Sequence, residues 1–317
     1  MLRYWLLALL FYLGTFTPLQ ARTYDDIVAS GQITIAVYRD FPPYSFLSQS
    51  GEPQGLDVWL ASLIAEQMGL KLELLWMTAG ERSDDDLRNY LWKGLNLTSD
   101  DGRRLKADVM LRVPYDREWQ LMRDDVGELA HGQVYMFAPY QTEQWKVAFD
   151  PDKIAQIETL ALFQYEPIGV VEDSLPQFYF TSASDRFRQQ THTYPNLQLA
   201  FSDLITKKLT AIMGMGGQID WLIHTQANTT QASTKPTIQS SDRLYPMLGK
   251  PKWEIGIAVH ESNRQLAYVL EDITSNAVIS GQIARWATSL GMHWQAPEQY
   301  RDLATPANAA EQTTPPK

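Results

Sequence analysis

The fold is decided by three neighbouring segments: QITIAVY at Gln32–Tyr38, LDVWLASLIAEQM at Leu56–Met68 and KLELLWM at Lys71–Met77. The first is alternating and β-branched, as strands are, and the third has a similar strand-like pattern. The middle segment has apolar residues at helical spacing and is followed by Gly69, a residue that often ends helices. This strand–helix–strand order predicts a βαβ unit, which favours a parallel sheet in an α/β fold.

The rest of the chain continues the alternation of strands and helices. Further strands are predicted at Ala107–Val113, Gln133–Pro139, Trp145–Phe149, Pro167–Val171, Thr210–Met213 and Trp253–Val259. Helices are predicted at Asp84–Trp92, after an N-cap at Ser174, and at Leu197–Leu209, Gln265–Ile283 and Arg285–Leu290. The segment Asn228–Ser241, dense in Thr, Ser and Gln, is predicted to be a loop, and the Ala-, Thr- and Pro-rich C-terminal end a disordered tail.

Composition excludes several classes of protein. The chain has 317 residues, of which 44% are hydrophobic, so about two folded domains are expected rather than a disordered chain. It has no cysteine, which excludes disulfides, thiolate zinc sites, iron–sulfur clusters, a cysteine nucleophile and an N-terminal lipid-anchored cysteine. The formal charge of −10 argues against a nucleic-acid partner.

Residues 1–21 read MLRYWLLALLFYLGTFTPLQA, with Arg3 before an apolar run and a small residue at the end. This pattern predicts a secretory signal peptide. The alternative is a membrane anchor, but the apolar run of about 13 residues is shorter than the roughly 20 that a spanning helix needs. The mature protein is therefore expected to be soluble and periplasmic, with no membrane insertion once the signal is removed.

No motif for catalysis or metal binding stands out. The chain lacks Gly-Lys-Ser/Thr, Gly-x-Ser-x-Gly and His-Glu-x-x-His, and its five histidines are not spaced as metal pairs. The run Asp84-Asp85-Asp86 is interpreted as a helix start rather than a cation loop. The run Gly214–Gly217 lacks the third glycine of a dinucleotide-binding turn. We therefore expect no cofactor, no metal and no enzyme activity.

Two loops that follow predicted strands are candidate ligand contacts. One is the proline-aromatic loop Phe41–Phe46, and the other is Val113–Glu118, which contains Arg117. Ligands of open α/β sheets bind beyond the carboxyl ends of strands, and an arginine there can hold a carboxylate through two hydrogen bonds. A packed Pro-Tyr turn and a surface Arg–Glu pair explain the second loop equally well.

The order of these pieces resembles the bacterial extracellular solute-binding proteins of family 3, the periplasmic amino-acid-binding type. The pieces that carry the resemblance are, in order, Gly31–Val37 with Pro42-Pro43-Tyr44, Gly55-Leu56-Asp57-Val58, Asp108-Val109-Met110 leading to Arg117, Phe137-Ala138-Pro139-Tyr140, Ile168-Gly169-Val170 with Ser174, and Gly256–Val259. Each piece is short, but six in this order behind a signal peptide form a specific pattern.

The resemblance implies a type II periplasmic-binding-protein fold, in which two α/β lobes are joined by two crossover strands. The implied domains are a signal peptide at 1–21, lobe one at 22–144 and 255–300, lobe two at 145–254 and a disordered tail at 301–317. The ligand would bind between the lobes. The residues that the resemblance assigns to ligand binding are Phe41, Tyr44, Arg112, Arg117 and Ser174.

The chain also departs from the family pattern. Pro114 replaces the threonine expected before the ligand-binding arginine, and Arg112 stands where a hydroxyl residue is expected. Met215 stands near the position of the lobe-two aspartate that pairs with a ligand's α-ammonium group. Arg117 and Phe137 are 20 residues apart, a longer step than in amino-acid binders. A desolvated ligand ammonium group would lack its usual counter-charge, so the α-amino-acid recognition set is incomplete.

Three functions remain open. The first is a periplasmic receptor that binds a small, carboxylate-bearing ligand for uptake by an ABC-type permease. The alternative is an accessory protein, because the segments around Ala107–Glu118 and Trp253–Val259 look like a branch associated with periplasmic quinoprotein alcohol dehydrogenases. The third is an enzyme on this scaffold that uses Glu118, Glu172 or Asp173 as acid or base.

Overall fold

The computed structural model describes residues 21–95, 104–229 and 237–303. Residues 1–20 of the predicted signal peptide and most of the predicted tail lie outside these ranges. Within them, no helix is long and apolar enough to cross a membrane.

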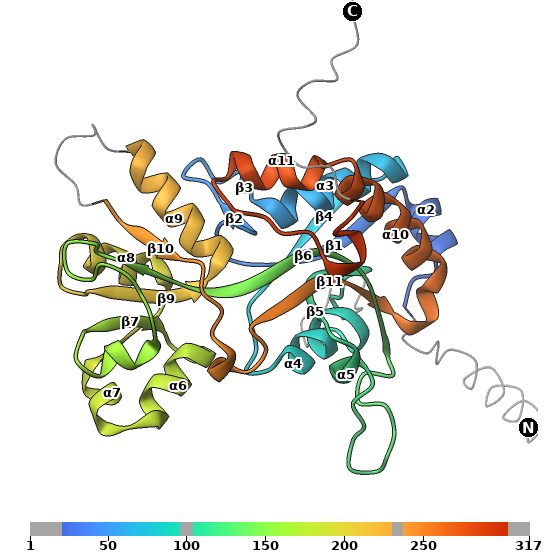
Figure 1. Ribbon diagram of the computed structural model, residues 1–317. Helices are drawn as coiled ribbons and strands as arrows, with labels where there is room; N and C mark the ends of the chain where they lie inside the picture. Colours follow the sequence, from blue (N-terminus) through green and yellow to red (C-terminus); the bar gives the residue numbers. More distant parts are fainter. Residues whose placement is uncertain (1–20, 96–103, 230–236, 304–317) are drawn as a thin grey trace, which may run out of the picture.

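Nine strands of the described residues form one hydrogen-bonded sheet (Figure 1). Their order is β4 (Lys71–Met77), β1 (Gln32–Tyr38), β5 (Val109–Tyr115), β11 (Lys252–His260), β6 (Val134–Phe149), β9 (Ala211–Met215), β7 (Ile168–Val171) and β8 (Thr191–Tyr194), with β10 (Gln239–Ser241) paired to β6. A separate two-stranded sheet consists of β2 (Phe46–Leu47) and β3 (Pro53–Gln54).

Helices alternate with these strands. The α-helices are α2 (Tyr24–Ser30), α3 (Leu56–Met68), α4 (Ser83–Leu87), α5 (Arg117–Gln120), α6 (Leu175–Ala183), α7 (Asp185–Gln190), α8 (Leu197–Ile205), α9 (Gly216–Thr229), α10 (Arg264–Ile279) and α11 (Gln282–Ser289). A π-helical segment, η1 (Arg88–Trp92), extends α4, and the short 3₁₀ helices are η2 (Leu160–Gln164), η3 (Pro246–Leu248), η4 (Glu261–Asn263) and η5 (Glu298–Tyr300).

The βαβ unit predicted from the sequence is confirmed. Strand β1 pairs in parallel with β4 over all seven residues of each strand, and α3 connects them. Gly69 ends α3 with a φ of +66°, and its N–H donates to carbonyl groups of the last turn. The carboxyl ends of β1 and β5, a second parallel neighbour of β1, therefore lie at the same edge of the sheet.

The prediction of two strands at Gln133–Pro139 and Trp145–Phe149 was wrong, because the structure has one continuous strand, β6. The first part of β6 pairs with β11 and its last part pairs with β9. Pro139 does not break the strand, since it falls at a bulge in the ladder with β11, where its missing N–H is not needed. Ala138, which precedes it, has a φ of +45°.

The buried apolar residues gather in two halves of the molecule. We call the half with β1, β4, β5, α3 and α10 lobe one, and the half with β7, β8, β9 and α6–α9 lobe two. Figure 1 shows β6 and β11 running between the two halves. The long strand β6 contributes buried residues to both, so it is a continuous connection between the lobes.

Several other boundaries differ from the predictions. The predicted helix Gln265–Ile283 is interrupted near Gly281, whose φ of +73° separates α10 from α11. Within the predicted loop Asn228–Ser241, the last three residues form β10 on the edge of β6. Residues 230–236 of that loop lie outside the described ranges. Helix α7 and strand β8 have no counterpart in the prediction.

Candidate functional site

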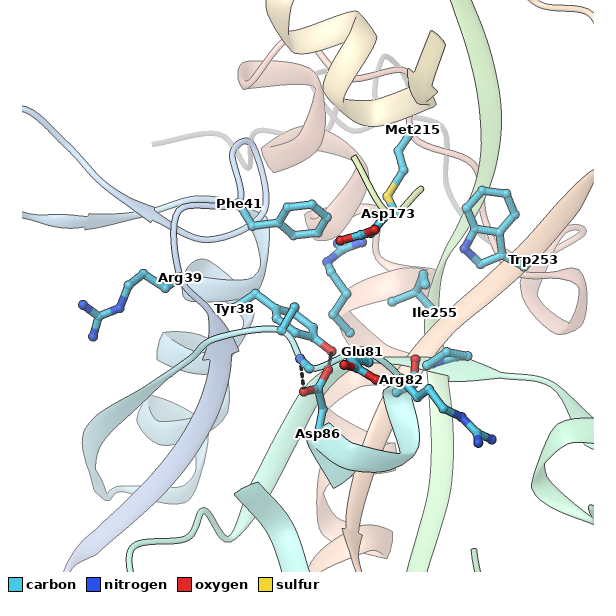
Figure 2. A pocket seen from close by; sticks show the side chains of 15 residues that line it. Tyr38, Arg39, Phe41, Glu81, Arg82, Asp86, Asp173, Met215, Trp253 and Ile255 are labelled. Atoms are coloured by element: carbon cyan, nitrogen blue, oxygen red, sulfur yellow. Dashed lines mark hydrogen bonds between the residues drawn. The ribbon is translucent and has the colours of Figure 1, made fainter. Parts of the chain in front are cut away.

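A cavity of about 420 Å³ lies between lobe one and lobe two (Figure 2). Lobe one contributes the end of β1 and part of β5, whereas lobe two contributes Asp173 after β7 and Met215 at the end of β9. Trp253 and Ile255 of β11 form a further wall. Ligands of open α/β sheets bind beyond the carboxyl ends of the strands, and this cavity occupies that position.

A second cavity, of about 190 Å³, is lined mainly by lobe two. Phe41 and Met215 line both cavities, so these two side chains stand between them. Ser174 and Asn196, the N-cap residues of α6 and α8, line the smaller cavity. The two cavities together form a divided space along the boundary of the lobes.

Arg112 reaches the larger cavity from a bulge in β5. In the ladder with β11, Leu111 faces Ile257 and Val113 faces Gly256, so Arg112 has no residue opposite it. Its φ of +61° lies in the left-handed region, where residues other than glycine are uncommon. Bulges of this kind re-aim a side chain relative to the strand. The bulge therefore explains how a strand residue lines the cavity.

The guanidinium group of Arg112 is almost completely buried, with the residue 6% exposed. Its Nε donates to Asp57 Oδ2 at 2.6 Å, and its Nη2 donates to Asp57 Oδ1 and to Gln141 Oε1, each at 3.0 Å. The group also stacks on the ring of Tyr44, 3.4 Å from the ring centroid. Its Nη1 is buried and has no hydrogen-bond partner in the part of the chain that the structure describes.

Asp57 is fully buried in the first turn of α3, and it also accepts a 2.9 Å hydrogen bond from the Tyr140 hydroxyl. Burial is the largest single influence and disfavours the charged guanidinium, but the charge and hydrogen bonds of Asp57, together with the nearby Tyr140 and Tyr44, outweigh it and raise the pKa of Arg112 above its ordinary value. Arg112 therefore stays charged, and Asp57 balances most of that charge.

Tyr44 connects this ion pair to a second buried carboxylate. Its hydroxyl donates to Glu143 of β6, whose other oxygen accepts from the backbone N–H groups of Gln144 at 2.9 Å and Gly217 at 3.4 Å. Burial raises the pKa of Glu143 above its ordinary value of 4.5, although the hydrogen bond from Tyr44 acts in the opposite direction. Because Gly217 begins α9, the contacts run from Arg112 into lobe two.

Comparison with known proteins finds a family model that matches part of the chain. Residues 33–103 match the bacterial extracellular solute-binding proteins, family 3. This match confirms the resemblance that the sequence motifs carry. No curated protein sequence matches the chain.

Solved structures share the fold at low sequence identity. An ancestral cationic amino acid solute-binding protein has 15% identity and a TM-score of 0.62, covering 84% of this chain and 98% of its own. An amino acid ABC transporter substrate-binding protein from Streptococcus pneumoniae bound to L-arginine has 16% identity and a TM-score of 0.56, covering 86% and 98%. A histidine kinase sensor domain similar to periplasmic binding proteins has 16% identity and a TM-score of 0.56, covering 88% and 100%. The type II periplasmic-binding-protein fold is thereby confirmed.

The five residues that the family resemblance assigned to ligand binding lie in different surroundings. Phe41 lines both cavities, Arg112 lines the larger one, and Ser174 lines the smaller one. Tyr44 is fully buried beneath Arg112. Arg117 is exposed on α5 and lines neither cavity. Their roles in ligand binding stay predictions, and the structure brings Phe41 and Arg112 together but not Arg117.

Sequence reasoning missed the partners that fix the site. Asp57 belongs to the motif Gly55-Leu56-Asp57-Val58, but its ion pair with Arg112 forms only because α3 and β5 lie next to each other in the folded protein. Asp86 of α4 lines the larger cavity and accepts hydrogen bonds from the Tyr38 hydroxyl and the Gly80 N–H, each at 2.7 Å. Burial raises the pKa of Asp86 above its ordinary value. The run Asp84-Asp85-Asp86 is interpreted as a helix start, and nothing in that pattern indicates that the carboxyl group of Asp86 lines a cavity.

The three carboxylates suggested for acid–base chemistry are dispersed. All three are exposed, and Asp173 lines the larger cavity, whereas Glu118 and Glu172 line neither of the two cavities. Among the described residues, no three His, Asp or Glu side chains are grouped so that they could hold a metal ion.

Proposed function

We propose that this chain is a periplasmic receptor that takes a small, carboxylate-bearing ligand into the cavity between its lobes for ABC-type uptake. The observation that carries the proposal is Arg112, which lines that cavity and whose buried Nη1 has no hydrogen-bond partner among the described residues. A buried donor left without a partner costs about 1–3 kcal/mol, and more when it is charged. A ligand carboxylate or other acceptor would remove this cost.

The remaining walls suit an organic molecule. Phe41, Tyr38 and Trp253 offer aromatic surfaces, and about 420 Å³ is within the usual range for small-molecule sites. The Streptococcus pneumoniae relative is named as an ABC transporter protein and was solved with L-arginine. An amino acid or a related carboxylate is therefore the first class of ligand to test. The predicted signal peptide and the match to a family of extracellular solute-binding proteins support a periplasmic location.

Isothermal titration calorimetry against a panel of carboxylates and amino acids tests the proposal. The sharpest variant is Arg112→Lys, which keeps a cation opposite Asp57 but removes the second terminal nitrogen. We expect binding in the wild type and a loss of about tenfold or more, equal to about 1.4 kcal/mol, in Arg112→Lys. Arg117→Lys is the matched control and should bind as the wild type does. Absence of any binder, or equal losses in both variants, would contradict the proposal.

A second candidate function rests on the segment that runs from the second half of α5 towards β6. We call residues 119–131 the hairpin, because Arg123 and Leu129 form an antiparallel bridge within it. It projects from the body of lobe one (Figure 1). Four of its apolar side chains are exposed, Leu121, Met122, Leu129 and above all Val126 at 81%. Exposed apolar side chains of this kind favour a protein contact, as expected of an accessory protein that assists a periplasmic quinoprotein alcohol dehydrogenase.

Crosslinking to a purified periplasmic quinoprotein alcohol dehydrogenase tests this second function. Val126→Ser should reduce the crosslinked product, whereas Val28→Ser, another exposed valine, on α2, should leave it unchanged. A complex that forms equally with both variants excludes the hairpin as the contact. No complex at all excludes the accessory function for that dehydrogenase.

A further inference from the structure

Helix α9 belongs to lobe two, yet one of its sides lies against lobe one, next to β2 and β3 (Figure 1). Gly217, Trp221 and His224 are spaced four and three residues apart, so they share one side of the helix. Each of them meets a residue of lobe one, and the helix rises by about 10 Å between the first and the last. The contact with lobe one therefore extends well beyond the start of the helix.

The first turn of α9 lies directly on the loop that follows β1. A Cβ at Gly217 would lie 2.6 Å from the Tyr44 hydroxyl and 2.8 Å from Met292 Cε, so this approach needs a glycine. Tyr44 and Met292 both belong to the buried core of lobe one. One residue further along, Gln218 Nε2 donates to the Pro42 carbonyl at 3.2 Å.

The second turn of α9 adds a polar and an aromatic contact. Asp220 Oδ2 accepts from the backbone N–H of His293 at 3.0 Å. The same carboxylate pairs at 2.8 Å with Lys146 of β6, whose side chain is almost completely buried, so the ion pair fixes the position of Asp220. Next to it, the ring of Trp221 packs on Phe46 of β2, with the ring centroids 5.9 Å apart.

The last contact is made by His224. A Cβ at Gly291 would overlap Cβ and Cγ of His224, so the histidine lies directly on the Gly291 backbone. Gly291 follows α11 in lobe one and has a φ of +76°. Of the α9 residues that contact lobe one, Gln218 lines the smaller cavity and the others line neither cavity. Most of this contact is therefore made without residues that a ligand would touch.

We propose that α9, through Gly217, Gln218, Asp220, Trp221 and His224, is a latch that holds the two lobes in their present arrangement whether or not a ligand is bound. Two lobes joined by strands such as β6 and β11 can rotate about them, and the latch opposes that rotation. The cavity is then preformed, so a ligand loses no binding free energy to closing the lobes. This inference concerns the free protein and does not rest on either proposed function.

The distance between the lobes in the ligand-free protein tests the latch. The chain has no cysteine, so Glu66→Cys on α3 and Ser202→Cys on α8, both exposed, take one spin label each. The protein is dialysed in urea and refolded before measurement, so that no co-purified small molecule is retained. We expect one narrow distance distribution by pulsed electron paramagnetic resonance. A broad or two-peaked distribution in this ligand-free protein overturns the proposal.

Two substitutions in the labelled protein weaken the latch from the side of lobe one. Gly291→Ala places a methyl group against His224 and should shift the distribution to longer distances. Gly69→Ala is its matched control, because Gly69 also follows a helix of lobe one, with a φ of +66°, but an added Cβ there meets nothing within 4 Å. Both substitutions strain the backbone in the same way, so a shift in Gly291→Ala alone comes from separating α9 from lobe one.

Phe46→Ala is the second substitution, and it removes the aromatic contact with Trp221 without straining the backbone. It should broaden the distribution, whereas Phe178→Ala, at an exposed phenylalanine on α6, should match the wild type. Thermal unfolding verifies that each variant is folded before it is measured. A shift or broadening in either latch variant beyond its control supports the latch, and distributions that match the controls in both overturn it.

Discussion

The guanidinium carbon of Arg112 lies 3.4 Å from the centroid of the Tyr44 ring, so that a charged group at the ligand cavity rests on a fully buried aromatic side chain. Tyr44 in turn donates to Glu143, and Glu143 accepts from Gly217 of lobe two. A continuous set of buried polar contacts thus joins the cavity wall to the helix that packs against lobe one. Substitutions within this set are therefore expected to change stability or ligand binding.

Asp57→Asn should destabilise the protein strongly. The substitution leaves the buried charge of Arg112 without its carboxylate, and breaking a buried ion pair in this way costs about 3–5 kcal/mol. Urea-induced unfolding monitored by tryptophan fluorescence measures this loss. Asp185→Asn, which breaks an exposed pair with Arg188, is the control and should cost less than about 1 kcal/mol. Similar losses in the two variants would show that Asp57 does not hold the charge.

Glu143→Gln should change the pH dependence of stability. Because burial raises the folded-state pKa of Glu143 above 4.5, the folded state favours the protonated carboxyl. The stability that Glu143 contributes is present below pH 4.5 and is lost as the pH rises through the folded value. Glutamine mimics the neutral form, so the free energy of unfolding of the variant should fall less over this range.

This prediction is tested by measuring the free energy of unfolding in urea from pH 4.5 to neutrality for the wild type and Glu143→Gln. Arg112 and Tyr44, the groups that face Glu143, are unchanged in both proteins. Glu66→Gln, an exposed substitution on α3, serves as the control and should follow the wild type. Parallel profiles for Glu143→Gln and wild type would be inconsistent with a raised pKa.

Local patterns explain how much of the fold the sequence predicts. Strand β1, helix α3 and strand β4 are predictable to the residue, because the hydrophobic period and the closing Gly69 specify each of them without help from distant residues. Strand β6 is not, since Pro139 normally ends a strand and is tolerated here only where β11 makes a bulge. That bulge depends on residues more than a hundred positions away.

The site is predictable in part for the same reason. Phe41 follows a strand in a proline-rich loop, so its position at the strand end can be inferred locally. The arginine cannot: Arg117 follows a strand in sequence, yet it lies exposed on α5, while Arg112 inside β5 is turned to the cavity by a φ of +61°. Neither that backbone conformation nor the pairing with Asp57 leaves a signal in the one-dimensional pattern.

His131 should make the protein less stable in acid. Its side chain is buried against Trp119, with the ring centroids 4.3 Å apart, and its Nδ1 is 3.5 Å from Asp84. Burial lowers the pKa of His131 below 6.5, although the charge of Asp84 opposes this. The unfolded chain therefore binds more protons below pH 6.5, and the stability contributed by His131 is lost as the pH falls through that value towards the folded pKa.

Thermal unfolding of wild type and His131→Gln between pH 5 and neutrality measures this effect, with the exposed His192→Gln as the control. The wild type and His192→Gln should lose stability more steeply below pH 6.5 than His131→Gln does. If the stability of all three proteins falls equally steeply with pH, the surroundings of His131 do not favour its neutral form.

Gly217→Ala should open the boundary between α9 and lobe one. A Cβ at this position would lie 2.6 Å from the Tyr44 hydroxyl and 2.8 Å from Met292 Cε. Tyr44 is fully buried and bonded to Glu143, so it cannot move aside, and α9 must retreat instead. Alanine is the better helix former by about 1 kcal/mol, so a loss of compactness or of ligand affinity would come from the contact and not from the helix itself.

Small-angle scattering gives the radius of gyration of the Gly217→Ala protein, and calorimetry gives its affinity for the ligand found with the wild type. We expect a larger radius and weaker binding, because retreat of α9 also loosens the hydrogen bond from Gln218 Nε2 to the Pro42 carbonyl, 3.2 Å long. Ala227→Ser, exposed on the same helix, should match the wild type in both measurements. An unchanged radius and affinity in Gly217→Ala would mean that closure of the lobes does not depend on the approach of α9 to Tyr44.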